Sequence, residues 1–318
     1  MRFGILGNAK IARTQVIPAL LAQGHEVVAM GTRNPQAPLW EGAPAGLNVL
    51  SYEGLLLEDI DAVYIGLPNP LHVDWTLKAL AAGKHCLCEK PWALSERDLD
   101  LVEDMVAATG CVAMEAFMVR HHPQWQWLRE QMPQGCDHIQ VSFSYHNTDP
   151  ANIRNQPNMG GGALWDIGCY AVMAGIWLQG SEPDEVSLRS IVHPDWGTDI
   201  HSWGELVWNS GCVLQFGVST QSGPEQSLRA TRAGQWAMLD TPFNPPAVTT
   251  AHHGMGPWPS AQRVTFEAAN HYGLMADAFE QRVQQGHAQT EWAQSRSVNR
   301  TLCRLLSSQV LLEPASQV

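Results

Sequence analysis

The sequence has few of the features that mark disulfide-rich, zinc-binding or nucleic-acid-binding proteins. Its seven cysteines are an odd number with no C-x-x-C pair, so we expect neither a disulfide framework nor a metal site, and we expect reduced thiols. Only 19 lysines and arginines stand against 31 aspartates and glutamates, a net charge of −12 without any dense basic cluster. This balance argues against nucleic acid and against an anionic membrane surface as partners.

Long apolar runs are also lacking. No run approaches the roughly 20 residues that are needed to span a bilayer. The amino terminus passes from Met1-Arg2 directly into a glycine-punctuated strand, without the apolar core and cleavage site of a secretion signal. We therefore expect a cytoplasmic protein with no membrane partner. With 318 residues, 45% of them apolar, the chain can bury a large core, and this length favours two domains.

The first 118 residues alternate short apolar strands with amphipathic helices. Ser95 is expected to cap one of these helices, because a serine hydroxyl accepts from the backbone N–H groups of a first turn. This alternation predicts an α/β domain with a doubly wound parallel sheet. The strands are expected at residues 3–6, 26–30, 61–67, 85–88 and 111–115, and the helix after Ser95 at 95–108.

The turn after the first strand is a weakened form of the Rossmann fingerprint G-x-G-x-x-G. It reads Gly7-x-Ala9-x-x-Ala12, with alanines in the second and third glycine positions. Small residues let a pyrophosphate approach the backbone amides at the amino end of the following helix. The candidate cofactor-binding residues here are Gly7, Asn8, Ala9, Lys10 and Ile11.

The end of the second strand distinguishes between the two nicotinamide cofactors. An NAD site places an acidic residue there for the ribose 2′-hydroxyl, and no acidic residue occurs between Val27 and Trp40. Thr32 and Arg33 instead offer a hydroxyl and a guanidinium, which suit a 2′-phosphate. The pattern favours NADP over NAD, and an ordinary polar turn is the alternative.

Lys90 stands at the carboxyl end of the strand at residues 85–88. Pro91 cannot donate to a sheet ladder, so the backbone must leave the sheet at Glu89-Lys90-Pro91. Ligands bind at this edge of an open parallel sheet. The alternative is a solvated lysine that merely closes a strand.

After Pro123 the pattern changes to strands in series, which favours an α+β domain with a largely antiparallel open sheet covered by helices on one face. We expect a dinucleotide-binding domain at 1–118 and a substrate-binding and oligomerisation domain at 119–318. The predicted strands are 136–145, 185–193, 200–207, 212–220, 227–231, 236–239 and 263–266. The predicted helices are 124–131, 163–178, 272–285 and 292–311, with a surface loop at 240–259.

Several motifs together resemble the glucose-fructose oxidoreductase, inositol dehydrogenase and MocA family. The likeness covers most of the chain and is greatest to the branch that holds dimeric dihydrodiol dehydrogenase and NADP-dependent xylose dehydrogenases. Two departures are the alanine-for-glycine turn and Trp92 after the Glu-Lys-Pro motif. The motifs are Gly4-Ile5-Leu6-Gly7-Asn8-Ala9-Lys10-Ile11-Ala12, Gly66-Leu67-Pro68-Asn69-Pro70-Leu71-His72, Gly83-Lys84-His85 with Glu89-Lys90-Pro91, and Glu115-Ala116-Phe117-Met118 with His122-Pro123.

The resemblance implies a catalytic set. The family motif D-x-G-x-(Y/H), matched by Asp166, Gly168 and Tyr170, faces the nicotinamide together with the lysine that Lys90 matches. Without the resemblance, Asp166 and Tyr170 are more simply a capping acid and a core-edge aromatic, four residues apart on one helical face. Carbonyl reduction needs a proton donor at the oxygen, and a nearby ammonium lowers the ordinary tyrosine pKa of about 10. We predict Tyr170 as general acid/base, Lys90 as electrostatic activator and Asp166 as orienting group.

Further residues take roles in the same prediction. The sites where the family lines the cofactor are matched by Leu67, Pro68, Asn69, His72, Glu89, Lys90 and Arg120, and the candidate substrate contacts are Trp92, Arg154 and Trp165. The predicted activity is hydride transfer between NADP(H) and a sugar, polyol or related diol or carbonyl. The alternatives are a non-catalytic regulator that binds dinucleotide and sugar, and redox-assisted glycoside cleavage with tightly held NAD. By analogy of fold we expect a homodimer or homotetramer formed through the second-domain sheet.

Overall fold

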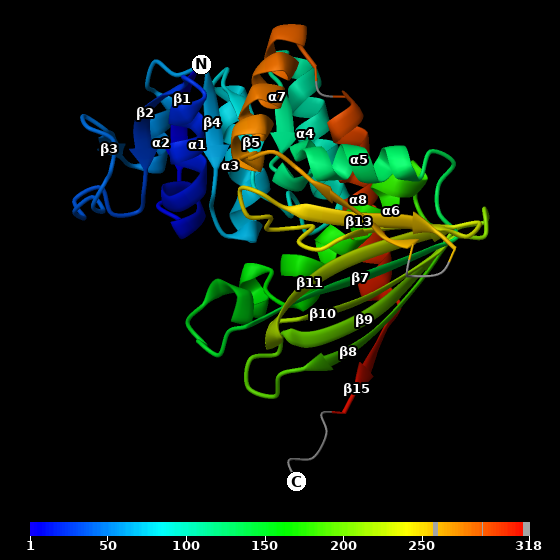
Figure 1. Cartoon of the computed structure of the whole chain (residues 1–318). Coiled ribbons are helices and arrows are strands. Elements are labelled where there is room, and N and C mark those ends of the chain that lie inside the picture. The colour runs from blue at the N-terminus through cyan, green and yellow to red at the C-terminus, as the bar shows by residue number, and fades with distance from the viewer. Residues whose placement is uncertain (257–259, 288, 314–318) are drawn as a thin grey trace. The chain divides into compact units, whose positions relative to one another are not determined.

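The computed structural model describes residues 1–256, 260–287 and 289–313 (Figure 1). The chain divides into two compact units, which are described separately: Met1–His121 with Asn270–Ser295, and His122–Ala269 with the chain from Arg296 onward. The first unit thus includes Asn270–Ser295, a segment from late in the sequence. The division expected from the sequence, 1–118 and 119–318, does not include this return.

The first unit contains, among its described residues, a six-stranded parallel sheet in the order β3-β2-β1-β4-β5-β6. The order reverses between β1 and β4, and such a switch point is where open α/β sheets bind ligands. The predicted doubly wound sheet is confirmed. The elements are β1 Arg2–Leu6, η1 Ala12–Val16, α1 Ile17–Ala22, β2 Glu26–Gly31, β3 Asn48–Leu50, α2 Tyr52–Leu56, β4 Ala62–Ile65, η2 Asn69–Leu71, α3 His72–Ala81, β5 His85–Cys88, α4 Glu96–Thr109, β6 Ala113–Glu115, η3 Met118–His121, α7 His271–Gln285 and the first part of α8 Gln289–Ser307.

Local signals set the boundaries of α4. Ser95 Oγ accepts from the backbone N–H of Asp98 at 3.3 Å, as predicted, and Gly110 ends the helix in the left-handed conformation. The short elements β3 and α2 were not predicted, because three to five residues are too few for a periodic pattern to be recognised.

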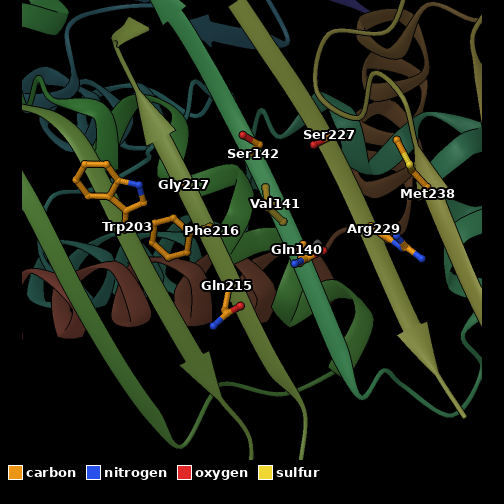
Figure 2. A pocket seen from close by; sticks show the side chains of 10 residues that line it. All are labelled: Gln140, Val141, Ser142, Trp203, Gln215, Phe216, Gly217, Ser227, Arg229 and Met238. Carbon is orange, nitrogen blue, oxygen red and sulfur yellow. The ribbon is translucent and has the colours of Figure 1, made fainter.

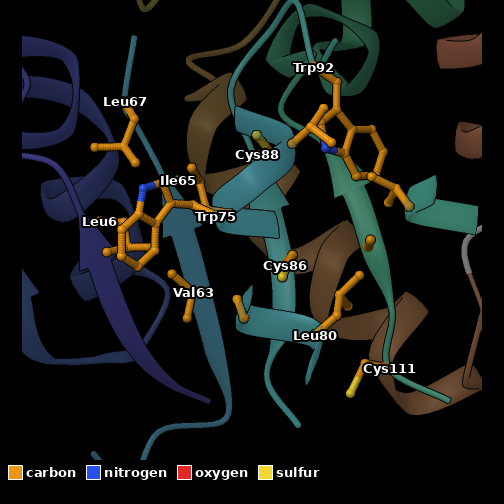
Figure 3. Packing of buried hydrophobic residues seen from close by; sticks show 14 of the residues in the cluster. Leu6, Val63, Ile65, Leu67, Trp75, Leu80, Cys86, Cys88, Trp92 and Cys111 are labelled. Carbon is orange, nitrogen blue, oxygen red and sulfur yellow. The ribbon is translucent and has the colours of Figure 1, made fainter. Parts of the chain in front are cut away.

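The hydrophobic core of the first unit lies between the sheet and its helices. Figure 3 shows Leu6, Val63 and Ile65 from the strands together with Trp75 and Leu80 of α3. The returning helix α7 covers the start of the sheet, where the Phe3 and Phe279 rings lie 6.1 Å apart. The alternating strand and helix pattern of the first 121 residues therefore needs α7 to complete the burial of its core.

The second unit contains, within the part that the structure describes, a nine-stranded sheet in the order β14-β13-β12-β11-β7-β10-β9-β8-β15. Its pairs are antiparallel except β7 with β10 and β8 with β15, which confirms the largely antiparallel sheet. The elements are α5 Pro123–Gln131, β7 His138–His146, η4 Ile153–Asn155, η5 Pro157–Met159, η6 Leu164–Gly168, α6 Cys169–Gln179, β8 Glu185–Val192, β9 Asp199–Val207, β10 Val213–Ser219, β11 Gln221–Arg232, β12 Gln235–Leu239, β13 Thr250–Met255, β14 Gln262–Thr265 and β15 Gln309–Leu312.

Two predictions for this unit are wrong. The expected loop at 240–259 contains the strand β13, which pairs with β12 and β14; its residues 257–259 lie outside the described part. The expected helix at 292–311 ends at Ser307, and Gln309–Leu312 joins the sheet beside β8. β15 pairs with β8, far earlier in the chain, and β13 pairs with the strands on either side of it. In both cases the pairing, and not the pattern of the segment itself, makes the strand.

The helix α6 is the buried centre of the second unit. Every residue from Cys169 to Leu178 is buried, as expected of a helix that is apolar on all sides. The stretch Pro157–Gln179 is long and apolar enough to cross a membrane by length and composition, but 89% of the tested window is buried inside the protein. A core helix accounts for this feature. All seven cysteines lie in the described part as thiols, and six of them are buried.

Candidate active site

The turn after β1 fits a pyrophosphate. Gly7 has φ +102°, and a Cβ on it would lie 2.6 Å from the carbonyl oxygen of Gly66, so only glycine lets the ends of β1 and β4 approach this closely. Asn8 and Lys10 are exposed at the start of the helix, whereas Ala12 is fully buried. The small residues thus serve close packing here, as the fingerprint requires.

Thr32 and Arg33 follow β2 at the same edge of the sheet. The backbone N–H of Thr32 donates to Leu50 O at 2.9 Å, which fixes the turn, and the Arg33 side chain is exposed. Burial raises the pKa of the Tyr52 phenol, and the neighbouring Arg33 opposes that rise. A hydroxyl and a guanidinium in this place are donors for a phosphate.

His72 connects the ends of β4 and β5. Its ring is buried, with Nδ1 at 2.9 Å from Pro91 O and Nε2 at 2.7 Å from Leu67 O. Burial lowers the pKa of the imidazole, and the two carbonyls oppose this. His72 therefore holds the two loops through its own ring atoms. Pro68 and Asn69, between them, are half-buried.

Lys90 is half-buried next to a carboxylate and two phenols of the first unit. The Tyr64 hydroxyl donates to Glu89 Oε1 at 2.7 Å, and burial raises the pKa of Glu89 against the opposing charge of Lys90. Burial and Glu89 also raise the pKa of Tyr272, on α7, while Lys90 lowers it. Tyr64 and Tyr272 could not be predicted from the sequence, because one lies in a core strand and the other in the returning segment.

Trp92 and Arg120 are core residues of the first unit. Trp92 is 2% exposed: its backbone N–H donates to Glu115 Oε1 at 3.0 Å and its indole N–H to Thr76 Oγ1 at 3.2 Å. The ring also packs on Trp292, 5.0 Å between centroids, and Figure 3 shows it among the buried side chains. Arg120 is 4% exposed, and its charge opposes the rise that burial causes in the pKa of Glu115. The expected substrate contact of Trp92 has no support in these contacts.

Tyr170 lies in the first turn of α6 and is 5% exposed. Its ring packs on Phe143, 5.6 Å away on β7, and on Phe243, 5.2 Å away. These contacts orient the phenol from the sheet side. Trp165, expected to contact substrate, is 9% exposed.

Asp166 lies one turn before Tyr170 and holds two other side chains. Its Oδ2 accepts from the Tyr145 hydroxyl at 2.7 Å and from Arg154 Nε at 2.9 Å. The pKa of Arg154 is raised, first by Asp166 and further by Tyr145 and Tyr170, so the guanidinium stays charged in this cluster. Tyr145 was missed, because nothing in an alternating strand distinguishes a site tyrosine from a sheet tyrosine.

The predicted residues thus gather in two places. Glu89, Lys90 and His72 lie together in the first unit, and Arg154, Asp166 and Tyr170 lie together in the second. The approach of Lys90 to Tyr170 joins the two units and stays a prediction.

Family models match both halves of the chain. The model described as "Oxidoreductase family, NAD-binding Rossmann fold" matches residues 1–117, and the model described as "GFO/IDH/MocA C-terminal domain" matches residues 136–239. The chain belongs to the GFO/IDH/MocA oxidoreductase family. This confirms the resemblance that the motifs indicated and the two-part fold expected from it.

Relatives within the GFO/IDH/MocA family span almost the whole chain. The D-xylose 1-dehydrogenase (NADP(+)) 2 of Haloferax volcanii is 33% identical, covering 97% of each chain. The dTDP-3,4-didehydro-2,6-dideoxy-α-D-glucose 3-reductase of Actinomadura kijaniata is 30% identical, covering 92% of this chain and 91% of the relative. A solved tyrosine-to-phenylalanine variant of KijD10, a 3-ketoreductase from that organism in complex with TDP-benzene and NADP, has a TM-score of 0.90 and 26% identity, covering 98% of this chain and 99% of that one.

Proposed function

We propose that this oxidoreductase transfers hydride between NADP(H) and a carbon bearing a hydroxyl or carbonyl in a sugar, polyol or related diol. The observation that carries the proposal is the placement of Lys90, beside the half-buried Glu89, at the carboxyl end of β5 in a unit that matches an NAD-binding Rossmann model. That edge of a doubly wound sheet is where dinucleotides bind.

The cofactor is NADP in this proposal. The turn from Gly7 to Ile11 would hold the pyrophosphate, and Thr32 and Arg33 would hold the 2′-phosphate. Two relatives support this choice, one with NADP in its name and one crystallised with NADP. When bound, the cofactor supplies or accepts the hydride.

Tyr170 is the proton donor and acceptor at the substrate oxygen in this proposal. Its phenol is fixed by Phe143 and Phe243, so its hydroxyl has a defined position. Lys90 would bring a positive charge to the phenol and to the substrate oxygen, which favours phenolate and stabilises negative charge on the reacting oxygen. Asp166 brings a carboxylate to the same face of the helix.

The sugar class rests on the relatives. One is a xylose dehydrogenase and another a dTDP-sugar reductase, both aligned with most of this chain. Several hydroxyls in a substrate suit a site with a carboxylate, a guanidinium and phenols, because each of these groups can pair with one of them.

The experiment compares Tyr170→Phe with Arg33→Gln. Tyr170→Phe should lower kcat by about 10³-fold or more and leave the NADPH dissociation constant within about 2-fold, because proton transfer is lost and the cofactor turn is untouched. Arg33→Gln should raise the KM for NADPH by about 10-fold without changing that for NADH, since one charge-assisted phosphate contact is lost. The matched control is Arg97→Gln, an exposed arginine on α4.

Three results would contradict the proposal. Normal turnover by Tyr170→Phe would remove the assigned acid/base. Tight NADPH binding without reaction on a broad panel of sugars and diols would favour the regulator. Release of nitrophenol from model glycosides would favour glycoside cleavage.

The open face of the nine-stranded sheet is the proposed surface for a homodimer or homotetramer. Figure 2 shows a pocket on it with Trp203 on β9, Gln215 on β10 and Arg229 on β11, and Trp203 is 45% exposed. An exposed indole together with an arginine and uncharged polar side chains is typical of protein interfaces, where aromatic residues and arginine are enriched. Sedimentation of Trp203→Glu and of the wild-type chain tests this, and an unchanged mass would contradict it.

A further inference from the structure

One carboxylate oxygen in the second unit receives two donors. Asp166 Oδ2 accepts from Tyr145 Oη at 2.7 Å and from Arg154 Nε at 2.9 Å. The Asp166 side chain is 13% exposed and the Arg154 side chain 46%. The three residues come from β7, η4 and η6, so the cluster ties three elements together at the start of the helix that carries Tyr170.

The backbone holds Arg154 in this place. Its carbonyl oxygen accepts from Gly162 N at 2.8 Å, and a Cβ on Gly161 would lie 2.5 Å from the same oxygen. Asn152 Oδ1 also accepts from the Arg154 backbone N–H at 3.1 Å. Only glycine lets the loop cross this closely, and the loop is therefore fixed against the start of the helix.

Two side chains of β7 are spaced like Asp166 and Tyr170 on the helix formed by η6 and α6. Phe143 and Tyr145 are two residues apart, so they share one face of the strand about 7 Å apart along it. Asp166 and Tyr170 are four residues apart, about 6 Å along the helix. Phe143 packs on Tyr170 while Tyr145 bonds to Asp166, so two side chains of one strand hold two of the helix.

We propose that Tyr145 and Arg154 are positioning residues of the reaction assigned above, and this inference rests on that function. They hold the Asp166 carboxylate in one orientation and neutralise its charge one helical turn from Tyr170. A carboxylate without this compensation would favour the protonated phenol and oppose its use as a base. Asp166 is thus the shared acceptor of the Tyr145–Asp166–Arg154 cluster.

The test is the pH profile of kcat and kcat/KM in the oxidative direction. Tyr145→Phe should move the limb that reports Tyr170 upward by about 0.5 pH unit and lower kcat by about 10-fold, because one donor to the carboxylate is lost. Arg154→Gln should move it by about 1 unit, since the compensating charge is lost. Arg154→Lys keeps the charge and should restore the limb, but not the full kcat, because the ammonium cannot reproduce the planar geometry of the guanidinium.

The matched control is Ser144→Ala. Ser144 precedes Tyr145 on β7 and points to the opposite face, where its hydroxyl donates to Gly223 O at 2.6 Å. This variant should leave the limb in place. A double variant, Tyr145→Phe with Arg154→Gln, should shift the limb by less than the sum of the single shifts, because both donors act on the same oxygen.

Each outcome decides the inference. A Tyr145→Phe profile that superimposes on the wild type, or additive shifts in the double variant, would overturn it. If Tyr145→Phe does not fold, Arg154→Gln against Arg154→Lys decides the question by the same limb. Failure of the proposed function gives a different result, namely a Tyr170→Phe variant that turns over normally. If Tyr170→Phe is inactive but the pH profile of Tyr145→Phe is unchanged, only the positioning role is contradicted.

Discussion

Within each unit, the helix that carries or borders site residues is capped by a contact of a different sequence separation. In the first unit, Ser95 caps α4 by accepting from a residue three positions away. In the second, the start of the helix that carries Tyr170 is capped by Asp199, whose Oδ2 accepts from Leu164 N at 2.8 Å across 35 residues. The same physical device is local in one unit and tertiary in the other. Motifs identify site residues in both units, but the helix start that positions Asp166 and Tyr170 is held by a residue far along the chain.

The largest expected losses in the free energy of unfolding come from replacing one glycine in each unit. A Cβ on Gly162, which has φ +113°, would lie 1.9 Å from Asp199 Oδ1, so Gly162→Ala should cost about 3 kcal/mol or more in the free energy of unfolding. Gly7→Ala in the first unit should cost a similar amount through its clash with Gly66 O, and should also weaken NADPH binding. Urea denaturation measures both.

The control for these variants is Gly223→Ala. No atom lies within 4 Å of a Cβ built on Gly223, so the change should stay within about 0.5 kcal/mol. If Gly162→Ala is as mild as this control, the close contact between the helix start and Asp199 is not maintained in solution.

Removing each cap measures how much a distant capping residue stabilises the protein compared with a local one. Asp199→Ala should cost about 3 kcal/mol, because Leu164 N and the buried Ser202 hydroxyl, 2.6 Å from Asp199 Oδ2, both lose their acceptor. Ser95→Ala should cost about 1 kcal/mol, as an accessible cap does. Equal losses in thermal denaturation would remove the distinction between a local and a tertiary cap.

Replacing one buried tryptophan in each unit compares how much its hydrogen bond stabilises the core. Trp92→Phe should lower the free energy of unfolding by about 1–2 kcal/mol, because the bond to Thr76 and the edge contact with Trp292 are lost. Trp177→Phe in the second unit should cost about 1 kcal/mol, since its indole N–H donates to Trp125 O at 3.4 Å. A large rise in substrate KM for Trp92→Phe at unchanged stability would return Trp92 to the substrate site.

The smallest expected effect is a loss of folding stability as the pH falls. His85 Nδ1 accepts from Val112 N at 2.9 Å, and burial lowers the pKa of this imidazole below 6.5. The unfolded chain then binds a proton on falling below pH 6.5 while the folded chain does not, so the stabilisation present above that pH is lost as the pH falls. Between pH 7 and 5 the wild type should therefore lose more of its free energy of unfolding than His85→Gln does. Parallel stability curves for the two proteins would contradict this.

The site residues that directly follow a recognisable strand could be predicted from the sequence. The turn at Gly7, the Thr32-Arg33 pair and Lys90 each follow a strand whose apolar run is visible in the sequence, and the carboxyl ends of parallel strands share one edge. Tyr145 and Tyr272 could not be predicted, because their partners lie on other elements far along the chain. The strand β13 was missed for another reason: Thr250–Met255 has no alternating apolar pattern, and it becomes a strand by pairing with β12 and β14 on either side of it.

The sequence by itself determined the class of fold, the family and the residue types at the cofactor edge, because strand period, turn chemistry and short motifs act over a few residues. Only the tertiary structure decided that Trp92 is a core residue, that α7 returns to the first unit and that Asp166 is held by Tyr145 and Arg154. The physical reason is that burial and hydrogen-bond partners are properties of elements packed together, and residues distant in the chain supply them.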